Sequence, residues 1–499
     1  MLHETRSLLC AIGMAVLVMA AHGCAGTHFR PAGNPPLAPV GFDPVKAADQ
    51  EYWSGIVFNG DKIGFSHFRL APALDAPGQL DITSEAVFSL KFLMMEKRFS
   101  LKAYDRVNAD LTISTFSYDY DMDGSTLHIT GKMQGDELHT QVDASGEITR
   151  QSLRTLGPVH PSSVLYLYPA VKGLQVGRSF EYLVYDGETR GISGARQEVL
   201  AFEESDLFAG NGFKVKTVLH GQEVTAWLDE AGRPLLEMAL GGVMISGIEG
   251  EAGAKAYLAR SSVNKSEALL DFSLIRTGVR LERPRQVEYL EVALTGIEAD
   301  TRIPSDGRQR CTWEDDRFIC RIDAAGHVLE PGGCGEEVSN PHLRSTIAVP
   351  AANGRIRELA SSLVRGRVRP EDRISAILAW MQEHIEREPV DVFSALDVLD
   401  KGRAECQGHA MLYAALARAA GLPTRVVNGI VYSGDHGGFL YHTWVETCVE
   451  GTWISIDPTF SQVRADATHI KIVEGEGPDD LMPLVGLIGR VQAEIISFR

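Results

Sequence analysis

The chain has 499 residues, too many for a single hydrophobic core, so two or three domains are expected. Hydrophobic residues make up 44% and charged residues 23%, an ordinary composition for a soluble globular protein. The net charge of −18, without any stripe of Lys and Arg, argues against nucleic acid and anionic membrane surfaces as partners.

The first residues predict export. Arg6 precedes an apolar run over residues 8–21, followed by small residues. Such a run is too short for a comfortable membrane span and is typical of a secretory signal, which we place at residues 1–23.

A lipid anchor is expected directly after this signal. Gly23-Cys24 resembles the lipobox of bacterial lipoproteins, although Ala21 stands where that motif usually has Leu. The resemblance implies lipidation of Cys24 and a cell-envelope lipoprotein facing the periplasm, and Ala25 favours the outer membrane. Simple secretion and an uncleaved anchor are the alternatives. A proline-rich segment over residues 24–48 suits a tether.

Residues 49–262 carry the pattern of a large antiparallel β domain. Short alternating runs such as Phe65–Leu70 and Leu111–Phe116 recur between turn residues such as Asp123-Gly124. Many short strands at this spacing predict a sheet that is curved or folded on itself.

A smaller β domain with a cysteine hairpin is expected over residues 263–344. A two-residue turn at Asp315-Asp316 would place Cys311 opposite Cys320 in a non-hydrogen-bonded pair, where Cα atoms lie close enough for a bridge. Export permits such a disulfide. Two reduced, buried thiols are the alternative.

The spacing of apolar residues changes in residues 345–499. Apolar residues recur every three to four positions over 356–363 and 374–385, which indicates two amphipathic helices. Cys406 then opens a third apolar run, which ends at Gly421 as a helix should. Together with the preceding strands, this pattern predicts an α+β, multidomain fold.

Cys406 is the candidate nucleophile. At a helix N-terminus, unpaired backbone N–H groups and the helix dipole favour thiolate over thiol. The Cys406 amide is also placed to donate to a developing oxyanion.

An imidazole and a carboxylate follow in the chain. His442 lies in a predicted strand over 440–449, and Asp457 ends the next one, 453–457. If these strands pair across the Glu450-Gly451 turn, His442 and Asp457 lie near each other. A thiol, a base and a group that orients the base are the parts of a cysteine acyl-transfer site.

Four blocks in this region resemble the transglutaminase-like superfamily, which is papain-like in its chemistry. They are Gly402-x-x-x-Cys406-x-Gly408-x-Ala410, Ala420-Gly421-Leu422-Pro423-Thr424-Arg425, His442-x-Trp444-Val445-Glu446 and Trp453-x-x-x-Asp457-Pro458-Thr459. The resemblance covers about a third of the chain and implies a C-terminal papain-like transglutaminase-core domain over 345–499. It assigns Cys406 as nucleophile, His442 as general base and later acid, and Asp457 as the orienting carboxylate.

Gln407, His409 and Trp444 flank these residues and are the candidates for substrate contacts, although packing is the commoner role of a histidine placed like His409. For the proposed triad, the alternatives are ordinary structural roles: a Cys406–Cys448 disulfide, a satisfied sheet histidine at 442, and a strand-ending turn at Asp457-Pro458. His436 competes weakly for the role of base. A metal site from His436, His442 and Cys406 has no supporting ligand spacing.

The leading interpretation is an exported thiol hydrolase that cleaves peptide or isopeptide bonds through a Cys thioester. Protein-modifying acyl transfer and a non-enzymatic envelope binding protein, with the fold as scaffold, are the alternatives. The expected partners are protein or peptide substrates of the cell envelope, with membrane contact through the lipid anchor alone and no nucleic acid. No cofactor or metal is expected, since no acidic loop resembles a calcium site. The sequence gives no indication of oligomeric state.

Overall fold

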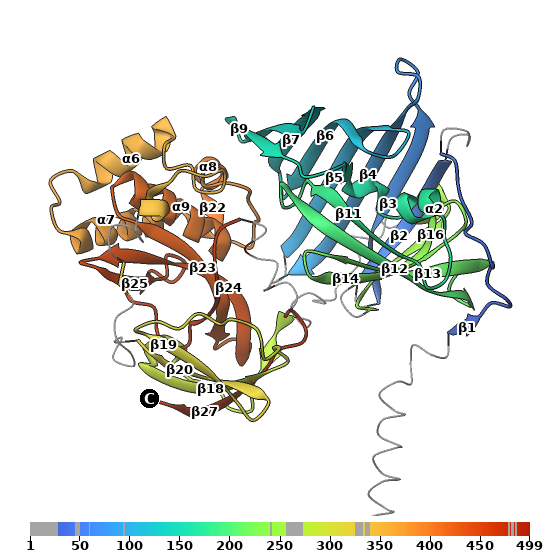
Figure 1. Cartoon of the computed structure of the whole chain (residues 1–499). Helices are drawn as coiled ribbons and strands as arrows, with labels where there is room; N and C mark the ends of the chain where they lie inside the picture. Colours follow the sequence, from blue (N-terminus) through green and yellow to red (C-terminus); the bar gives the residue numbers. More distant parts are fainter. Residues whose placement is uncertain are drawn as a thin grey trace, which may run out of the picture.

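The computed structural model describes residues 28–44, 50–58, 60–92, 95–239, 242–255, 273–324, 333–334, 340–477, 480, 484 and 487–499. The predicted signal segment, Cys24 and part of the predicted tether lie outside these residues. In the part of the chain so described, no helix is both long and apolar enough to span a membrane. An N-terminal β domain and a C-terminal unit with helices make up the molecule (Figure 1), in agreement with the predicted α+β class.

The N-terminal domain is built on one curved, 16-stranded sheet (Figure 1). Its centre is the antiparallel pair of β2 (Gln50–Phe58) and β16 (Met244–Glu249), from which successive strands run outward in both directions. On the β2 side follow, in order, β3 (Asp61–Pro72), β4 (Gln79–Phe92), β5 (Met95–Asn108), β6 (Ile113–Met122), β7 (Ser125–Gln134), β8 (Glu137–Ala144) and β9 (Glu147–Arg154). On the β16 side follow β15 (Pro234–Ala239), β14 (Gln222–Leu228), β13 (Asn211–Leu219), β12 (Gly191–Ser205), β11 (Ser179–Asp186) and β10 (Val159–Pro161), with β1 (Phe29–Pro31) paired to β12.

Along the strands of this sheet, side chains alternate between a buried and a more exposed face. Every second residue of β8, from Leu138 to Ala144, is buried while the residues between are partly exposed. Helix α2 (Leu167–Lys172) packs inside the curve, with Leu167 against residues of β3–β5 and Ala170 against residues of β11–β14. The short helix α3 (Glu251–Lys255) follows β16 and contacts β2 and β3.

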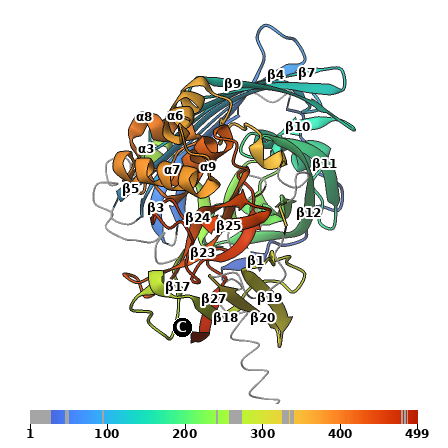
Figure 2. The same ribbon diagram turned by 90° about the vertical axis from the view of Figure 1, so that its left-hand side faces the viewer.

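The C-terminal unit has three layers. One layer holds the helices, the middle layer is a five-stranded sheet, and Figure 2 shows a four-stranded sheet on the side away from the helices. The helices are α6 (Gly354–Val364), α7 (Pro370–His384), α8 (Ala395–Lys401) and α9 (Cys406–Ala419). The five-stranded sheet runs in the order β17 (Ile275–Arg276), β24 (Gly438–Val449), β23 (Thr424–Ser433) and β26 (Ile470–Glu474), with β25 (Thr452–Ile456) paired to β24. The four-stranded sheet is β19 (Gln309–Glu314), β20 (Arg317–Asp323), β18 (Tyr289–Thr295) and β27 (Gln492–Phe498), and β21 (Glu386–Arg387) pairs with β22 (Arg403–Ala404) separately.

Two hydrophobic cores hold these layers together. The first lies between the helices and the five-stranded sheet, and α9 is buried within it from Gly408 to Arg418. The second lies between the two sheets and joins Leu290 and Val292 of β18 to Ile430 of β23. The predicted helices at 356–363, 374–385 and after Cys406 are confirmed, as is the pairing of the strands that carry His442 and precede Asp457.

The expected boundary at residue 344 does not separate two bodies in the structure. The small sheet is completed by β27 from the far end of the chain, and β17 pairs with β24 of the neighbouring sheet. Because the two sheets share one core, residues 273–499 form a single unit in the part described. The local spacing of apolar residues does not indicate that β27, near the end of the chain, pairs with β18.

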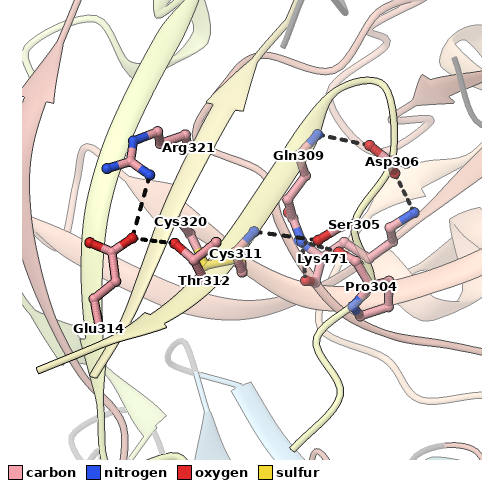
Figure 3. Close-up of a disulfide and its surroundings, with 10 residues drawn as sticks. All are labelled: Pro304, Ser305, Asp306, Gln309, Cys311, Thr312, Glu314, Cys320, Arg321 and Lys471. Atoms are coloured by element: carbon pink, nitrogen blue, oxygen red, sulfur yellow. Dashed lines mark hydrogen bonds and ion pairs between the residues drawn. A yellow bond between two sulfur atoms is a disulfide. The ribbon is translucent and has the colours of Figure 1, made fainter. Parts of the chain in front are cut away.

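Two disulfides join parts of this unit. Cys311 and Cys320 are bonded across the β19–β20 hairpin, with an S–S distance of 2.01 Å and the register that the turn predicts (Figure 3). Cys334 is bonded to Cys448 of β24. Cys448 is therefore not paired with Cys406, whose thiol is free.

Hairpin tips of the N-terminal domain hold the segment that leads to Cys406. In the β6–β7 turn, Asp123 accepts a hydrogen bond from the Asp391 amide at 3.0 Å and another, through its carbonyl, from Lys401 Nζ at 2.6 Å. In the β8–β9 turn, the Ser145 hydroxyl bonds to Asp397 of α8. The β domain thus contacts the C-terminal unit directly before its free cysteine.

Candidate active site

Cys406 is the first residue of α9. Its N-cap residue, Glu405, has an extended backbone and makes no side-chain capping bond to the helix. The first amides of an α-helix have no partner within the helix, so the positive end of α9 is directed at the region of the sulfur. Cys406 is partly exposed, whereas the rest of α9 from Gly408 to Arg418 is buried.

His442 and Asp457 meet where β25 ends beside β24. His442 lies in β24, Asp457 directly follows β25, and His442 Nε2 is 2.9 Å from Asp457 Oδ2. Because Nε2 is engaged by the carboxylate, Nδ1 is the ring nitrogen left for proton exchange with a thiol. Cys406 and His442 line the same cleft, so the sulfur lies near the imidazole.

The electrostatics of this group favour a charged imidazole. Burial by itself lowers the pKa of His442, but the negative charges of Asp457 and then Cys406 outweigh it and raise the pKa above its ordinary value. Burial also disfavours the Asp457 carboxylate, yet the attraction of His442 and hydrogen bonds from His442 and from His469 hold the pKa of Asp457 well below its usual range. Asp457 therefore stays ionised although it is 0% exposed.

The second histidine on this carboxylate is His469, which the sequence analysis missed. Its Nε2 is also 2.9 Å from Asp457 Oδ2, and its Nδ1 lies 3.2 Å from the Asp466 backbone carbonyl. The resemblance to known motifs ended at Thr459, so nothing drew attention to position 469. A signal did exist: His469 lies three residues after Asp466 and directly before the strand-like run Ile470–Val473.

A cleft of about 910 Å³ opens onto Cys406 and His442. Phe460 forms part of its wall and stacks on the His442 ring, with ring centroids 5.1 Å apart. The guanidinium groups of Arg285 and Arg387, which also line the cleft, lie 4.4 and 4.7 Å from the centroid of the Phe460 ring. The sulfur and the imidazole thus face a space large enough for a peptide side chain and its neighbouring backbone.

The three residues expected to contact substrate do not line this cleft. Trp444 is 0% exposed and donates its indole N–H to Ser455 Oγ at 2.9 Å, so it is a core residue. His409 is buried and bonded through Nδ1 to the Glu405 carbonyl at 2.9 Å, which is the packing alternative. Gln407 is partly buried next to Cys406. Trp444 shares a strand face with His442, and His409 shares a helix face with Cys406, but neighbouring elements cover both side chains.

His436, the weaker candidate for the base, does line the cleft. Its Nδ1 lies 2.8 Å from Ser433 Oγ, and the carboxylate of Asp457 is bonded to His442 instead. The expected alternative of His436 as base therefore lacks the orienting carboxylate that His442 has.

Donor atoms of His442, Asp457 and His469 lie within 4.8 Å of one another, a composition that also suits a metal ion. In this case each histidine Nε2 stands at direct hydrogen-bond distance from the same carboxylate oxygen. The geometry is that of a hydrogen-bonded chain in which the carboxylate orients the imidazole, and the imidazole can exchange a proton with the sulfur.

Comparison with known proteins agrees with this geometry. Residues 357–458 match the family model of the transglutaminase-like superfamily. Over 191 residues, the chain is 29% identical to the protein-glutamine gamma-glutamyltransferase of Pseudomonas aeruginosa, a match that covers 34% of this chain and 27% of that protein. Over 131 residues, it is 28% identical to the kyphoscoliosis peptidase of Mus musculus, covering 23% of this chain and 20% of that one.

Among solved structures, the periplasmic domain of TgpA from Pseudomonas aeruginosa matches 38% of this chain and 88% of its own, with 18% identity and a TM-score of 0.25. The matches to the glutamyltransferase and to the kyphoscoliosis peptidase each span less than a third of the length of those relatives. The matched segment contains Cys406, His442 and Asp457. Residues 357–458 therefore form a transglutaminase-like domain.

Proposed function

We propose that this protein is an exported cysteine hydrolase that cleaves peptide or isopeptide bonds through a thioester on Cys406. The observation that carries the proposal is the free Cys406 thiol at a helix N-terminus, beside a His442 that is bonded to the buried Asp457. Such a set has the parts needed to ionise the sulfur, hold the base and return the proton.

The reaction follows from these roles. The Cys406 thiolate attacks the carbonyl carbon of the substrate carboxamide, and the Cys406 amide donates to the oxyanion that forms. The C–N bond then breaks, and the amine leaves with the proton of the His442 imidazolium. Water attacks the thioester while His442 accepts its proton, the C–S bond breaks, and the acid product leaves.

Export is supported by the two disulfides and by the N-terminal sequence. Cys311–Cys320 and Cys334–Cys448 are bonds that form and persist in oxidising compartments. A cell-envelope location, with Cys24 lipidated behind the signal at residues 1–23, is part of the same proposal. Mass spectrometry of the mature N-terminus tests it, because a diacylglyceryl group on Cys24 and an unmodified N-terminus differ in mass.

Acyl transfer is the second candidate, because one relative is named a glutamyltransferase. The two candidates differ only in what attacks the thioester: water in hydrolysis, and an amine in transfer. Cell-envelope peptides incubated with the protein in ¹⁸O-water and a small primary amine separate them. Hydrolysis gives a new carboxyl group that carries ¹⁸O, whereas transfer gives a product heavier by the amine.

Cys406→Ala is the decisive variant in this experiment. We expect both products to vanish in Cys406→Ala and to persist in His128→Ala, which removes a partly exposed histidine of the N-terminal domain. Iodoacetamide should also label Cys406 in the native protein, since it is the free cysteine of the described chain. A Cys406 that stays unlabelled, with no product of either kind, would leave the non-enzymatic binding protein as the remaining interpretation.

A further inference from the structure

The two carboxylate oxygens of Asp457 accept hydrogen bonds from different kinds of donor. Oδ1 accepts the backbone amides of Thr459 at 2.7 Å and Phe460 at 3.2 Å. Oδ2 accepts Nε2 of both His442 and His469, each at 2.9 Å. The amides fix the direction of the carboxylate, while the two histidines share its outer oxygen.

His469 is fixed in place from behind. It is 0% exposed, and its Nδ1 lies 3.2 Å from the Asp466 carbonyl and 3.4 Å from the Asp466 carboxylate. That carboxylate accepts the Thr468 amide at 2.8 Å and pairs with Arg285 at 2.9 Å, and the Asp466 carbonyl also accepts from Arg308. The ring therefore cannot turn away from Asp457 without breaking contacts on both of its nitrogens.

The ion pairs and hydrogen bonds behind His469 also reach the cleft. Arg285 lines the cleft wall over Phe460, so the sequence of partners Arg285, Asp466, His469 and Asp457 runs from the cleft wall back to His442. The charged or titratable groups that face His469 are Asp457, Asp466 and His442, with Arg285 and Arg308 behind Asp466. A buried ring with this many ionic neighbours is more than a space-filling side chain.

We propose that His469 is a positioning residue of the thiol site, which holds the Asp457 carboxylate and competes with His442 for the same oxygen. The inference rests on the proposed cysteine chemistry and adds a residue to it. A donor on Oδ2 draws charge away from the bond to His442, whether His469 is neutral or cationic. Removing that donor therefore strengthens the attraction between Asp457 and the His442 imidazolium. The imidazolium then loses its proton at higher pH.

The test uses iodoacetamide alkylation of Cys406 in the full chain from pH 4 to 10. The upper transition of this profile reports the loss of the imidazolium proton from the coupled thiolate–imidazolium pair. For His469→Leu, which removes the donor and keeps a similar volume, we expect this transition to rise by about half to one pH unit, the size of one lost hydrogen bond. For His469→Gln, which keeps an N–H donor of similar reach, we expect a transition within a few tenths of the wild-type value.

Melting temperatures of both variants identify a purely structural role. If both variants melt lower by the same amount and the upper transition stays in place in both, His469 only packs, and the inference is overturned. A downward shift in His469→Leu overturns it as well. If the wild-type protein shows no upper transition and Cys406 is unreactive, the proposed function fails instead, so the two failures are distinguishable.

Discussion

The Asp457 carboxylate is fully buried, yet it is ionised because two imidazoles and two backbone amides bond to it. Asp457→Asn keeps the shape and removes the charge that raises the pKa of His442. The sign follows directly: with a lower pKa, the imidazolium loses its proton at lower pH, so the upper transition of Cys406 alkylation should fall by about 1–3 pH units. Turnover of any substrate should drop on the order of 10³- to 10⁴-fold.

The same alkylation profile provides the control for this prediction. Asp435→Asn removes an exposed carboxylate at the rim of the same cleft and should leave the transition where it is. An equal shift in the Asp435 and Asp457 variants would mean that the general field of the cleft, rather than the contact with Asp457, governs His442.

At the residue scale, the sequence predicted the chain order of thiol, imidazole and carboxylate, because each sits beside a recognisable helix start or strand. Trp444 and His409 are buried although they share a face with His442 and Cys406, because the neighbouring elements that cover a side chain do not show in the spacing along one element. His469 escaped notice because its partner Asp457 is 12 residues away and meets it only after β26 folds back.

At the scale of one element, α9 depends on a close approach at Gly408. A Cβ placed there would lie 2.5 Å from the Ala404 Cβ and 3.0 Å from a Val392 methyl. Gly408→Ala gains about 1 kcal/mol of helix propensity but overpacks a rigid site at a cost of about 1–3 kcal/mol. We expect a net loss of stability together with slower Cys406 alkylation, because the first turn of α9 must move.

Gly354→Ala in α6 is the matched control for Gly408→Ala. A Cβ at position 354 meets nothing within 4 Å, so this variant gains propensity without a clash. Thermal unfolding and alkylation rates of the two variants check the prediction. It is contradicted if Gly408→Ala is as stable and as reactive as Gly354→Ala.

At the scale of the whole molecule, the two disulfides differ in the length of chain that they close. Cys334–Cys448 spans a separation of 114 residues and Cys311–Cys320 spans 9. In the chain-entropy model, the longer loop is worth about 4–5 kcal/mol and the shorter one about 3 kcal/mol or less. The double variant Cys334→Ala with Cys448→Ala should therefore be less stable than Cys311→Ala with Cys320→Ala by about 2 kcal/mol.

Urea unfolding of the two double variants measures this difference. Both retain the free Cys406, so the alkylation rate in the absence of urea shows whether the site is still assembled. Equal midpoints for the two variants would contradict the loop-length argument.

The architecture of the molecule could be predicted only where the strands or cysteines that pair are close in sequence. The β19–β20 register followed from a two-residue turn, and the β24–β25 pairing from the turn at Glu450-Gly451. The return of β27 to β18 and the Cys334–Cys448 bond join distant segments, so no local pattern marks them. The contact of the Asp123 turn with Lys401 was invisible for the same reason.

The β2–β16 pair at the centre of the large sheet has a consequence for folding. About 190 residues separate these two strands in the chain, so β2 cannot form this pair until nearly the whole domain has reached the compartment in which it folds. Until then one edge of β2 has unsatisfied backbone groups that other unfolded chains can bind. The N-terminal domain therefore completes its folding only once its last strand has arrived, and a holding chaperone is most useful during this delay.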